Sequence, residues 1–396
     1  MHIIESYATH CGLRIDKPWI YQSYYPMSHK HYITLQPAGG ADVRDYAYWD
    51  EVIQYIKPEL EKRDIKIVQL GVEKDRAIPG CIHTQGSTEL SQVSYLINGS
   101  MLHLGVDSIG IHMASAYNKK IVGLYCNQWT RSSGPYWSDS KDVILHEPNR
   151  DGIKPSFSLQ EDPKTINEIS AEKIAQSVFD LLGIDAKIPY ERVHIGKNYN
   201  DINIQNVPTS VARISQQQLS NHPLIVRMDI EHDEKILEEQ LKQSVCVICS
   251  TKPIDKSMIV NYKPRIQNFV YYLDDNHDKD FVEFLRSNAV SHSLLTRDGG
   301  EKLEKLKLEY LDYGFIFRKY IDEEGMAILK GQDLSKYMFK TRKKILKNGK
   351  CYNSVSNLAA EKPMASVNDF SFTEVVDNPE FWDFLDETYV VKKLDS

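Results

Sequence analysis

The chain is poor in cysteine, in long hydrophobic runs and in excess charge. Its six cysteines among 396 residues are scattered at positions 11, 81, 126, 246, 249 and 351, a sparse use typical of reduced thiols in the cytosol. No apolar run approaches the ~20 residues that a membrane-spanning helix needs. The start Met1–Glu5 has no charged leader before an apolar segment, so no signal peptide is expected. These features predict a cytoplasmic protein without a membrane span.

The net charge of −7 gives no electrostatic reason to expect tight, non-specific binding of nucleic acid. One basic run, Lys340–Lys350, stands out against this background. We interpret it as the solvated face of a helix that Gly349 ends. A nucleic-acid partner is therefore disfavoured, although a basic stripe along a cleft would reopen that possibility.

Few residues have the spacing of metal ligands. Cys246 and Cys249 form a CxxC pair, but they lie in 244–250, which reads as a strand. Side chains three apart on a strand point to opposite faces, and no second CxxC completes a set of four ligands. The pair is interpreted as two small core residues, and no metal is expected.

The length is too great for one ordinary core, so two domains are expected. In the first part of the chain, apolar runs that read as strands alternate with segments of helical spacing. Pro58 is expected to bend or divide one helix, and Ser170 and Gly183 to cap another. The expected strands are 32–37, 65–71, 101–104 and 120–125, and the expected helices are 47–63, 88–97, one from about 110, and 170–182.

A segment rich in Asn, Gln, Ser and Pro follows at 184–222, and a second alternating series comes after it. We therefore predict an α/β protein with two Rossmann-like domains, 1–187 and 188–396, the second with a C-terminal extension. The expected strands of the second domain are 192–196, 224–229, 245–250, 268–273 and 291–296, and its expected helices are 233–243 and 278–288.

Two turns of the first domain attract attention because both follow strands. Ligands of open parallel sheets bind at the carboxyl ends of the strands, and the turns 37–46 and 105–112 belong to that edge. The second turn leads into a helix, whose N-terminus offers unpaired N–H groups and partial positive charge to a phosphate. The candidate ligand-binding residues are Gly39, Gly40, Arg44, Asp107, Ser108, Ile109, Gly110 and His112.

These motifs resemble a known family. Residues 31–137 are similar to the nucleotide-sugar-binding domain of glycosyltransferase family 9, the heptosyltransferase-like enzymes. The segment Val106–Ala114 resembles the family's Asp-Thr-Gly-x-x-His signature. The other blocks that carry the likeness are Leu35–Gly40 with Arg44 and Trp49, Val68–Gly71 with Asp75, and Gly134–Pro135.

The resemblance implies a GT-B architecture, a nucleoside-diphosphate-sugar donor and chemistry without a metal or other cofactor. Negative charge develops on the leaving diphosphate, and donors aimed at that charge lower the barrier. Ser108, His112 and the N–H groups around Ile109 and Gly110 would supply such donors. Arg44 would grip the diphosphate with its planar fork.

The remaining three candidates have their own tasks. Asp107 would orient the turn or a sugar hydroxyl, or act only as a helix N-cap. Gly39 and Gly40 would let the backbone approach the ligand closely.

The order of domains departs from the family, in which the acceptor domain precedes the donor domain. Either the acceptor half is missing, or the order is swapped and the second domain is the partner, which we favour. Transfer without a covalent intermediate needs a base for the acceptor hydroxyl. The candidates are Asp201, in a loop after a strand, and Asp229, in the cluster 229–233.

The sequence leaves other functions open. The acidic segment Leu273–Asp278 follows a strand and would suit a metal-dependent transferase. A sugar-nucleotide epimerase, a non-catalytic sugar-nucleotide-binding or assembly protein, and a DNA-glucosylating enzyme of phage type share features of this fold. A glycosyltransferase acting on an unidentified acceptor, with polysaccharide or lipopolysaccharide favoured, is the primary hypothesis.

Overall fold

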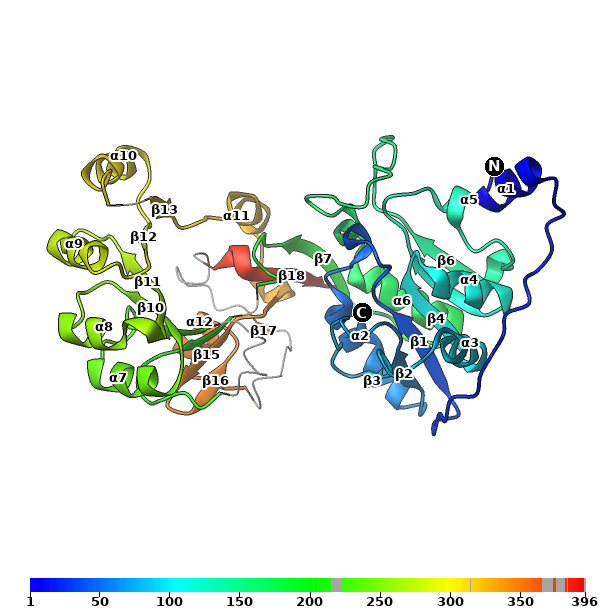
Figure 1. Ribbon diagram of the computed structural model, residues 1–396, viewed down its shortest axis with the longest axis horizontal. Coiled ribbons are helices and arrows are strands. Elements are labelled where there is room, and N and C mark those ends of the chain that lie inside the picture. Colours follow the sequence, from blue (N-terminus) through cyan, green and yellow to red (C-terminus); the bar gives the residue numbers. More distant parts are fainter. Residues whose placement is uncertain are drawn as a thin grey trace. The chain divides into compact units, whose positions relative to one another are not determined.

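The computed structural model describes residues 1–201, 203–214, 223–313, 315–364, 373–374, 382 and 384–394. The chain divides into two compact units, Met1–Tyr190 and Glu191–Asp395, and each is described by itself (Figure 1). The predicted boundary between 187 and 188 lies three residues before this division. No helix among the described residues has the length and apolarity to span a membrane.

The first unit holds a six-stranded sheet in the order β3-β2-β1-β4-β5-β6, and neighbouring strands pair in parallel throughout. This is the strand order of a Rossmann fold. Its strands are β1 (Tyr32–Gln36), β2 (Lys66–Gln69), β3 (Ile82–His83), β4 (Leu102–Val106), β5 (Lys120–Leu124) and β6 (Val143–His146).

Two pairs of helices pack on the sheet of the first unit. Helix α2 packs against α6, and α3 packs against α4. Because the strand order reverses between β1 and β4, right-handed crossovers place these pairs on opposite faces. The helices are α1 (Ile3–Cys11), α2 (Trp49–Glu61), α3 (Leu90–Gly99), α4 (Ile109–Ala116), α5 (Thr130–Ser133) and α6 (Ala171–Leu182).

The helical spacing of the sequence corresponds to buried faces. The five apolar residues of α2 that set its period (Trp49, Val52, Ile53, Ile56 and Leu60) are all buried. The Ser170 hydroxyl accepts from the N–H of Lys173, and Gly183 ends α6 in the left-handed conformation, as expected. Pro58 does not divide α2, which continues to Glu61. Pro58 lies in the last turn of this helix.

The second unit contains a sheet in the order β13-β12-β11-β10-β9-β8-β15-β16. The strands from β8 to β13 are parallel, and their order never reverses, unlike that of a Rossmann fold. The strands of this sheet are β8 (Ile204–Asn206), β9 (Leu224–Arg227), β10 (Cys246–Ser250), β11 (Ile266–Tyr272), β12 (His292–Thr296), β13 (Ile316–Arg318), β15 (Lys344–Lys347) and β16 (Lys350–Tyr352).

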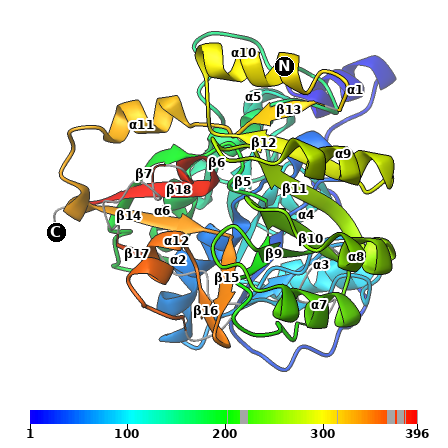
Figure 2. The ribbon, with the colours of Figure 1, turned by 90° about the vertical axis from the view of Figure 1, so that its left-hand side faces the viewer.

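A sheet wound in one direction places its right-handed crossover helices on one face. Figures 1 and 2 show α7 to α10 together on one side of these strands. Strands β8 to β13 therefore form a parallel α/β unit, as expected, but a singly wound one, and β15 pairs in parallel with the other side of β8. These helices are α7 (Glu234–Gln243), α8 (Lys256–Tyr262), α9 (Lys279–Ser287) and α10 (Gly300–Glu309).

A separate four-stranded sheet, in the order β17-β14-β18-β7, accompanies the parallel one. Strand β14 pairs antiparallel with both of its neighbours. The sequence predicted only a mixed extension here. The remaining elements are β7 (Tyr190–Ile195), β14 (Tyr337–Thr341), β17 (Thr373–Glu374), β18 (Thr388–Lys393), α11 (Glu323–Leu329) and α12 (Val355–Ala359).

The interpretation of the basic run 340–350 as a solvated helix face is wrong. The run covers the end of β14, all of β15 and the start of β16, and four of its cations are buried: Lys340, Arg342, Lys343 and Lys344. Asn348 and Gly349 both have positive φ between β15 and β16. An Asn-Gly pair at this place is a strong signal for a two-residue hairpin, and that signal outweighs the charge pattern.

A buried Asp–His pair joins α11 to β7 within the second unit. Asp322 accepts from the N–H of Gly325 at 2.9 Å as the N-cap of α11. Its other oxygen lies 2.6 Å from Nε2 of His194 on β7. We expect Asp322→Ala to lower the free energy of unfolding of this unit by about 2–4 kcal/mol, because the cap and a buried partner are lost together.

Chemical denaturation checks this expectation. The matched control is Asp333→Ala, which removes an exposed aspartate that caps only a 3-10 turn at Ser335 and should cost about 1 kcal/mol or less. Equal losses in the two variants would contradict the structural role assigned to the Asp322–His194 pair.

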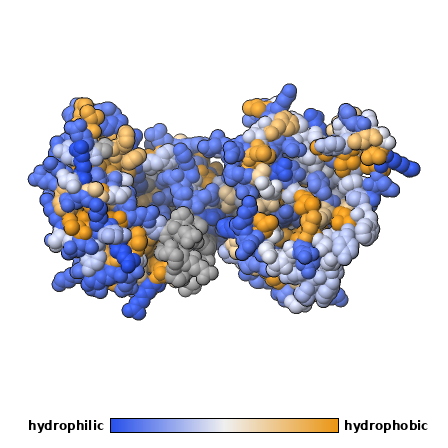
Figure 3. Space-filling view, in the orientation of Figure 1, coloured by the Kyte–Doolittle hydropathy of each residue, from blue (hydrophilic) through white to orange (hydrophobic). Residues whose placement is uncertain are grey.

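On the face of the molecule shown in Figure 3, hydrophobic residues are scattered among hydrophilic ones. Scattered exposed apolar residues are normal on soluble domains and need no function.

Candidate donor site at the carboxyl edge of the first sheet

The predicted turns meet where the strand order of the first sheet reverses. Strands β1 and β4 are parallel neighbours, and the next strands along the chain lie on opposite sides of them. Pro37–Gly40 follow β1, and Asp107 and Ser108 follow β4. Ligands of open α/β sheets bind in the crevice that forms at such a switch point.

Arg44 is held against the end of β4. Its Nη1 donates to the backbone oxygen of Asp107 at 2.7 Å, and its Nη2 lies 3.5 Å from Oδ2 of the same residue. Its Nε is buried and has no hydrogen-bond partner. One donor of the guanidinium fork therefore stays unused inside the site.

Gly39 makes this approach of Arg44 possible. A Cβ at Gly39 would lie 2.9 Å from Cδ of Arg44 and 3.1 Å from the backbone oxygen of Asp107. The lack of a side chain at Gly39 therefore lets Arg44 pack against the backbone at the end of β4. The sequence had suggested instead that it lets a ligand approach the backbone closely. Gly40 follows with a φ of +76° and open space around it, so the turn needs its conformational freedom.

Asp107 lies between two potential cations. Its Oδ1 is 3.9 Å from Nε2 of His112, on the side opposite to the Arg44 contact. Burial raises the pKa of Asp107, while Arg44 and His112 act to lower it. Burial also lowers the pKa of His112, against the attraction of Asp107. The His112 side chain keeps 36% of its surface exposed, so it remains available to a ligand.

Ser108, and not Asp107, is the N-cap of α4. Its side chain makes no capping hydrogen bond, and its Oγ is buried without a partner. Only 9% of the residue is exposed. A buried hydroxyl without a partner is uncommon because it costs free energy. A ligand oxygen at this helix N-terminus would supply the missing partner.

Two residues at the start of α4 differ from expectation. The N–H of Gly110 already donates to Oε1 of Gln36 at 3.2 Å, so it is not a free donor. Ile109 stands where the signature has glycine, and 49% of it is exposed. Of the two backbone amides expected to bind the ligand, the Gly110 N–H is therefore already engaged within the protein.

Gln36 also shapes the candidate site, a role that was not expected from the sequence. This last residue of β1 bonds Gly110, and a Cβ at Gly110 would lie 2.2 Å from its Oε1 and 2.7 Å from Nε2 of His103. His103 is completely buried. The polar residue at the end of the first strand was the available signal for Gln36. Trp49 is buried and donates to the backbone oxygen of Pro37 at 3.0 Å.

The base candidates of the second unit occupy different surroundings. Asp201 is exposed in a turn, with its N–H bonded to the backbone of Asn198. Asp229 is held by Arg227, whose Nε and Nη2 each donate to one carboxylate oxygen at 2.7 Å. Asp229 also lines a cavity at the end of β9, whereas Asp201 is not among its lining residues.

The cysteine pair lies on a strand, as expected, and the described residues contain no group of three metal-ligating side chains. Both Cys246 and Cys249 belong to β10 and are buried and unpaired. Among the described His, Cys, Asp and Glu residues, no cluster of three or more is arranged to hold a metal ion.

One known protein family matches part of the first unit. The sequence model described as glycosyltransferase family 9 (heptosyltransferase) matches residues 13–159. This confirms the resemblance expected over 31–137 and extends it in both directions. No curated protein matches the chain.

Several solved heptosyltransferase structures resemble the chain. The E. coli ADP-heptose lipopolysaccharide heptosyltransferase II is 17% identical, with 46% of this chain and 52% of that one covered and a TM-score of 0.32. A family 9 glycosyltransferase from Veillonella parvula is 18% identical (45% and 50% covered, TM-score 0.32). E. coli heptosyltransferase WaaC with ADP is 15% identical (45% and 54% covered, TM-score 0.29).

The chain spans about half the length of these structures. The family match includes β1 to β6 and the whole group of Arg44, Asp107, Ser108 and His112. Residues 13–159 of this protein, the family 9 segment, thus match the model of glycosyltransferase family 9 (heptosyltransferase).

Proposed function

We propose that the protein transfers a sugar from a nucleoside-diphosphate sugar to an acceptor hydroxyl. The observation that carries the proposal is the partnerless buried Oγ of Ser108, the residue that follows Asp107, which in turn contacts Arg44 and His112. It lies at a strand-order switch within the family 9 segment. An unsatisfied hydroxyl, an unused guanidinium N–H and an accessible imidazole together suit a diphosphate.

Each residue has a distinct task in this proposal. Ser108 and Arg44 bind diphosphate oxygens, and His112 donates a hydrogen bond to the charge that develops on the leaving group. Asp107 positions Arg44 and His112 from between them, so it acts through both. The reaction needs no metal or other cofactor here, as the resemblance implies.

The second unit is proposed as the acceptor side, with the domain order swapped relative to the family in a GT-B arrangement. Asp201 and Asp229 remain the candidates for the base that accepts the proton of the acceptor hydroxyl. A polysaccharide or lipopolysaccharide acceptor and a cytoplasmic location are part of the same proposal.

A non-catalytic sugar-nucleotide-binding or assembly protein is the second candidate. The observation in its favour is that both carboxylate oxygens of Asp229 are already hydrogen-bonded by Arg227. Donor binding with neither transfer nor hydrolysis across a panel of glycan acceptors would favour this candidate. A DNA acceptor is disfavoured by the net charge of −7.

Thermal-shift measurements with ADP-, UDP-, GDP- and CDP-sugars test the donor site. A ligand that binds only the folded state at 100 times its Kd stabilises it by ~2.7 kcal/mol. We expect one class of donor to raise the Tm. We expect Arg44→Gln to weaken its binding about tenfold or more, because charge-assisted hydrogen bonds are lost.

Arg63→Gln is the matched control for this experiment. Arg63 is exposed and lies just before β2, at the amino edge of the same sheet, so it carries the same charge away from the site. Donor affinity that falls equally in both variants, or in neither, would remove the support for a donor site at Arg44.

A further inference from the structure

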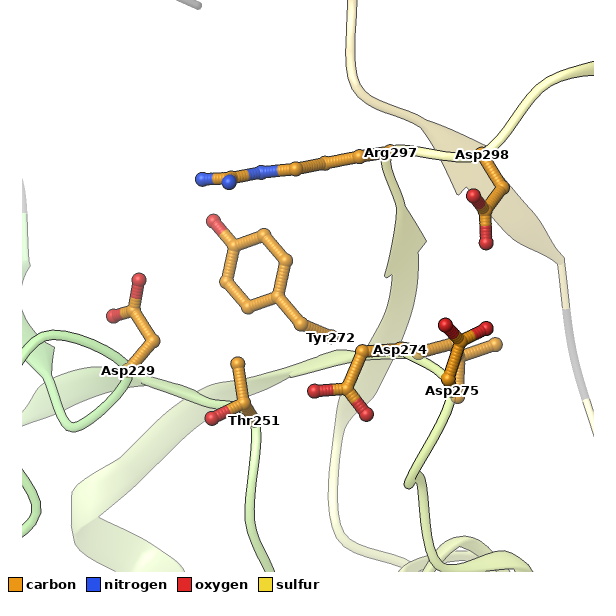
Figure 4. A pocket seen from close by; sticks show the side chains of 8 residues that line it. Asp229, Thr251, Tyr272, Asp274, Asp275, Arg297 and Asp298 are labelled. Atoms are coloured by element: carbon orange, nitrogen blue, oxygen red, sulfur yellow. The ribbon is translucent and has the colours of Figure 1, made fainter. Parts of the chain in front are cut away.

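A cavity of about 290 Å³ lies at the carboxyl edge of the second parallel sheet (Figure 4). Four neighbouring strands, β9 to β12, contribute residues at or just beyond their carboxyl ends. None of these residues belongs to the family 9 segment. The lining residues are Asp229, Thr251, Tyr272, Leu273, Asp274, Asp275, Arg297 and Asp298.

The side chains of this cavity combine hydrogen-bonding groups with an aromatic ring. Figure 4 shows Asp229, Thr251 and Asp274 along one side and the guanidinium of Arg297 beside the hydroxyl end of Tyr272. Burial raises the pKa of Tyr272, so its hydroxyl stays protonated at neutral pH. Carboxylates accept from hydroxyl pairs and a ring packs against C–H groups. This combination suits the hydroxyls and the apolar face of a sugar.

The two other carboxylates are engaged at the rim. Lys302 Nζ lies 3.3 Å from Oδ1 of Asp275 and 3.7 Å from Oδ1 of Asp298. One lysine therefore offsets part of the charge of both carboxylates, and Asp275 is strongly exposed. Among the described residues, no three metal-ligating side chains are grouped to hold a metal ion.

A second cavity of about 530 Å³ adjoins the first one and shares Asp229 and Arg297 with it. Its other charged lining residues are Arg227, Lys347 and Glu361. Lys347 is partly exposed, and its Nζ lies 3.7 Å from Oε2 of Glu231. This end of the combined cavity suits an anionic group.

Arg227 is rigidly placed between the two cavities. It is buried, bonds both oxygens of Asp229, and donates from Nη1 to Oε1 of Gln205 at 2.5 Å. A guanidinium fixed by such contacts keeps its charge and loses little freedom when a ligand arrives. These contacts fix the position of Arg227 relative to Asp229, which lines both cavities.

We infer that the carboxyl edge of the second sheet binds a saccharide that carries an anionic group. The sugar ring lies against Tyr272 with hydroxyls toward Asp229, Thr251 and Asp274, and the anion lies toward Arg297 and Lys347. This site is independent of the donor residues of the first unit. Its role as the acceptor site rests on the proposed function.

Isothermal titration of the full chain tests the inference with glucose, glucose 6-phosphate, glucuronate and inorganic phosphate. We expect binding of the phosphorylated or the carboxylated sugar, at least tenfold tighter than that of glucose or of inorganic phosphate. The two charged sugars distinguish a phosphate from a carboxylate as the anion. A ligand that satisfies only one end of the cavity should bind weakly.

Variants locate the binding. Arg297→Gln should weaken the charged sugar about tenfold, and Tyr272→Phe should weaken it a few-fold. The matched control Arg265→Gln, at the amino end of β11 and exposed, should leave it unchanged. Lys347→Gln, a partly exposed position, provides a second test of the basic end if Arg297→Gln does not fold.

Three results would overturn the inference: no sugar binding, binding that is equally weakened at Arg297 and Arg265, or binding that depends on Arg44. Sugar-nucleotide binding that persists without any charged-sugar binding would remove this site and leave the proposed donor site intact. Charged-sugar binding without any sugar-nucleotide binding would do the reverse.

Discussion

His112→Ala is expected to lower the rate of sugar transfer by about 100- to 1,000-fold, the usual effect of removing one donor to a developing negative charge. The imidazole is accessible on the first turn of α4 and lies 3.9 Å from the Asp107 carboxylate. Asp107→Ala should cause a comparable loss, because it releases both Arg44 and His112. Both variants should retain the fold, since Arg44 also bonds the backbone oxygen of residue 107.

Steady-state kinetics with the donor identified by thermal shift provides the measurement. The loss should lie mainly in kcat for His112→Ala, because its hydrogen bond strengthens in the transition state. His83→Ala, an exposed histidine on the edge strand β3, is the matched control. Wild-type rates in both the His112 and Asp107 variants would refute the assigned site.

Acidification from pH 7 to pH 5 is expected to destabilise the first unit. Burial lowers the pKa of His103 to about 3, whereas the unfolded chain has the ordinary value of ~6.5. The unfolded state therefore binds the proton first, and stability present above pH 6.5 is lost as the pH falls toward 3. This residue alone should account for about 2 kcal/mol at pH 5.

A second buried histidine acts in the same direction. Burial lowers the pKa of His146 to about 4, and its Nε2 lies 3.0 Å from Oγ of Ser177. The raised pKa of Asp107 opposes the trend, since protonation of that carboxyl favours the folded state. The sum remains a clear loss of stability in the acid range.

Denaturant titrations between pH 7 and pH 5 check this expectation. His103→Gln should flatten the pH dependence whatever its effect on stability at pH 7, because the titrating group is gone. His31→Gln removes an exposed histidine just before β1 and should leave the slope unchanged. A slope that is the same in all three proteins would show that His103 does not titrate on unfolding.

Local patterns predicted most individual elements. The five expected strands of the second half correspond to β7 and β9 to β12. Short runs rich in β-branched residues between polar segments are typical of buried strands. The cap of α6 was equally local, since Ser170 and Gly183 act on the backbone next to them. The hairpin at Asn348–Gly349 was missed although its signal was local, because the surrounding charges suggested a solvated helix.

The order of strands required more than local information. Both halves read as the same alternation of strands and helices. Yet the first sheet reverses direction between β1 and β4, while β8 to β13 of the second sheet follow one another in one direction. Which strands pair depends on packing between distant helices and on the apolar surface that each face buries. This packing between residues far apart in the chain cannot be read from the spacing of residues in a single sequence.

By itself, the sequence determined the alternating α/β pattern, the two turns that hold Arg44 and Asp107, and the resemblance to family 9. Residue type, spacing and backbone preference act over a few positions, so they can be read along the chain. Only the tertiary structure decided which groups are satisfied: Gln36 takes the Gly110 amide, while the Ser108 hydroxyl stays without a partner. It also brought Tyr272 and Arg297 to one cavity, because hydrogen-bond partners and cavities arise from residues far apart in the chain.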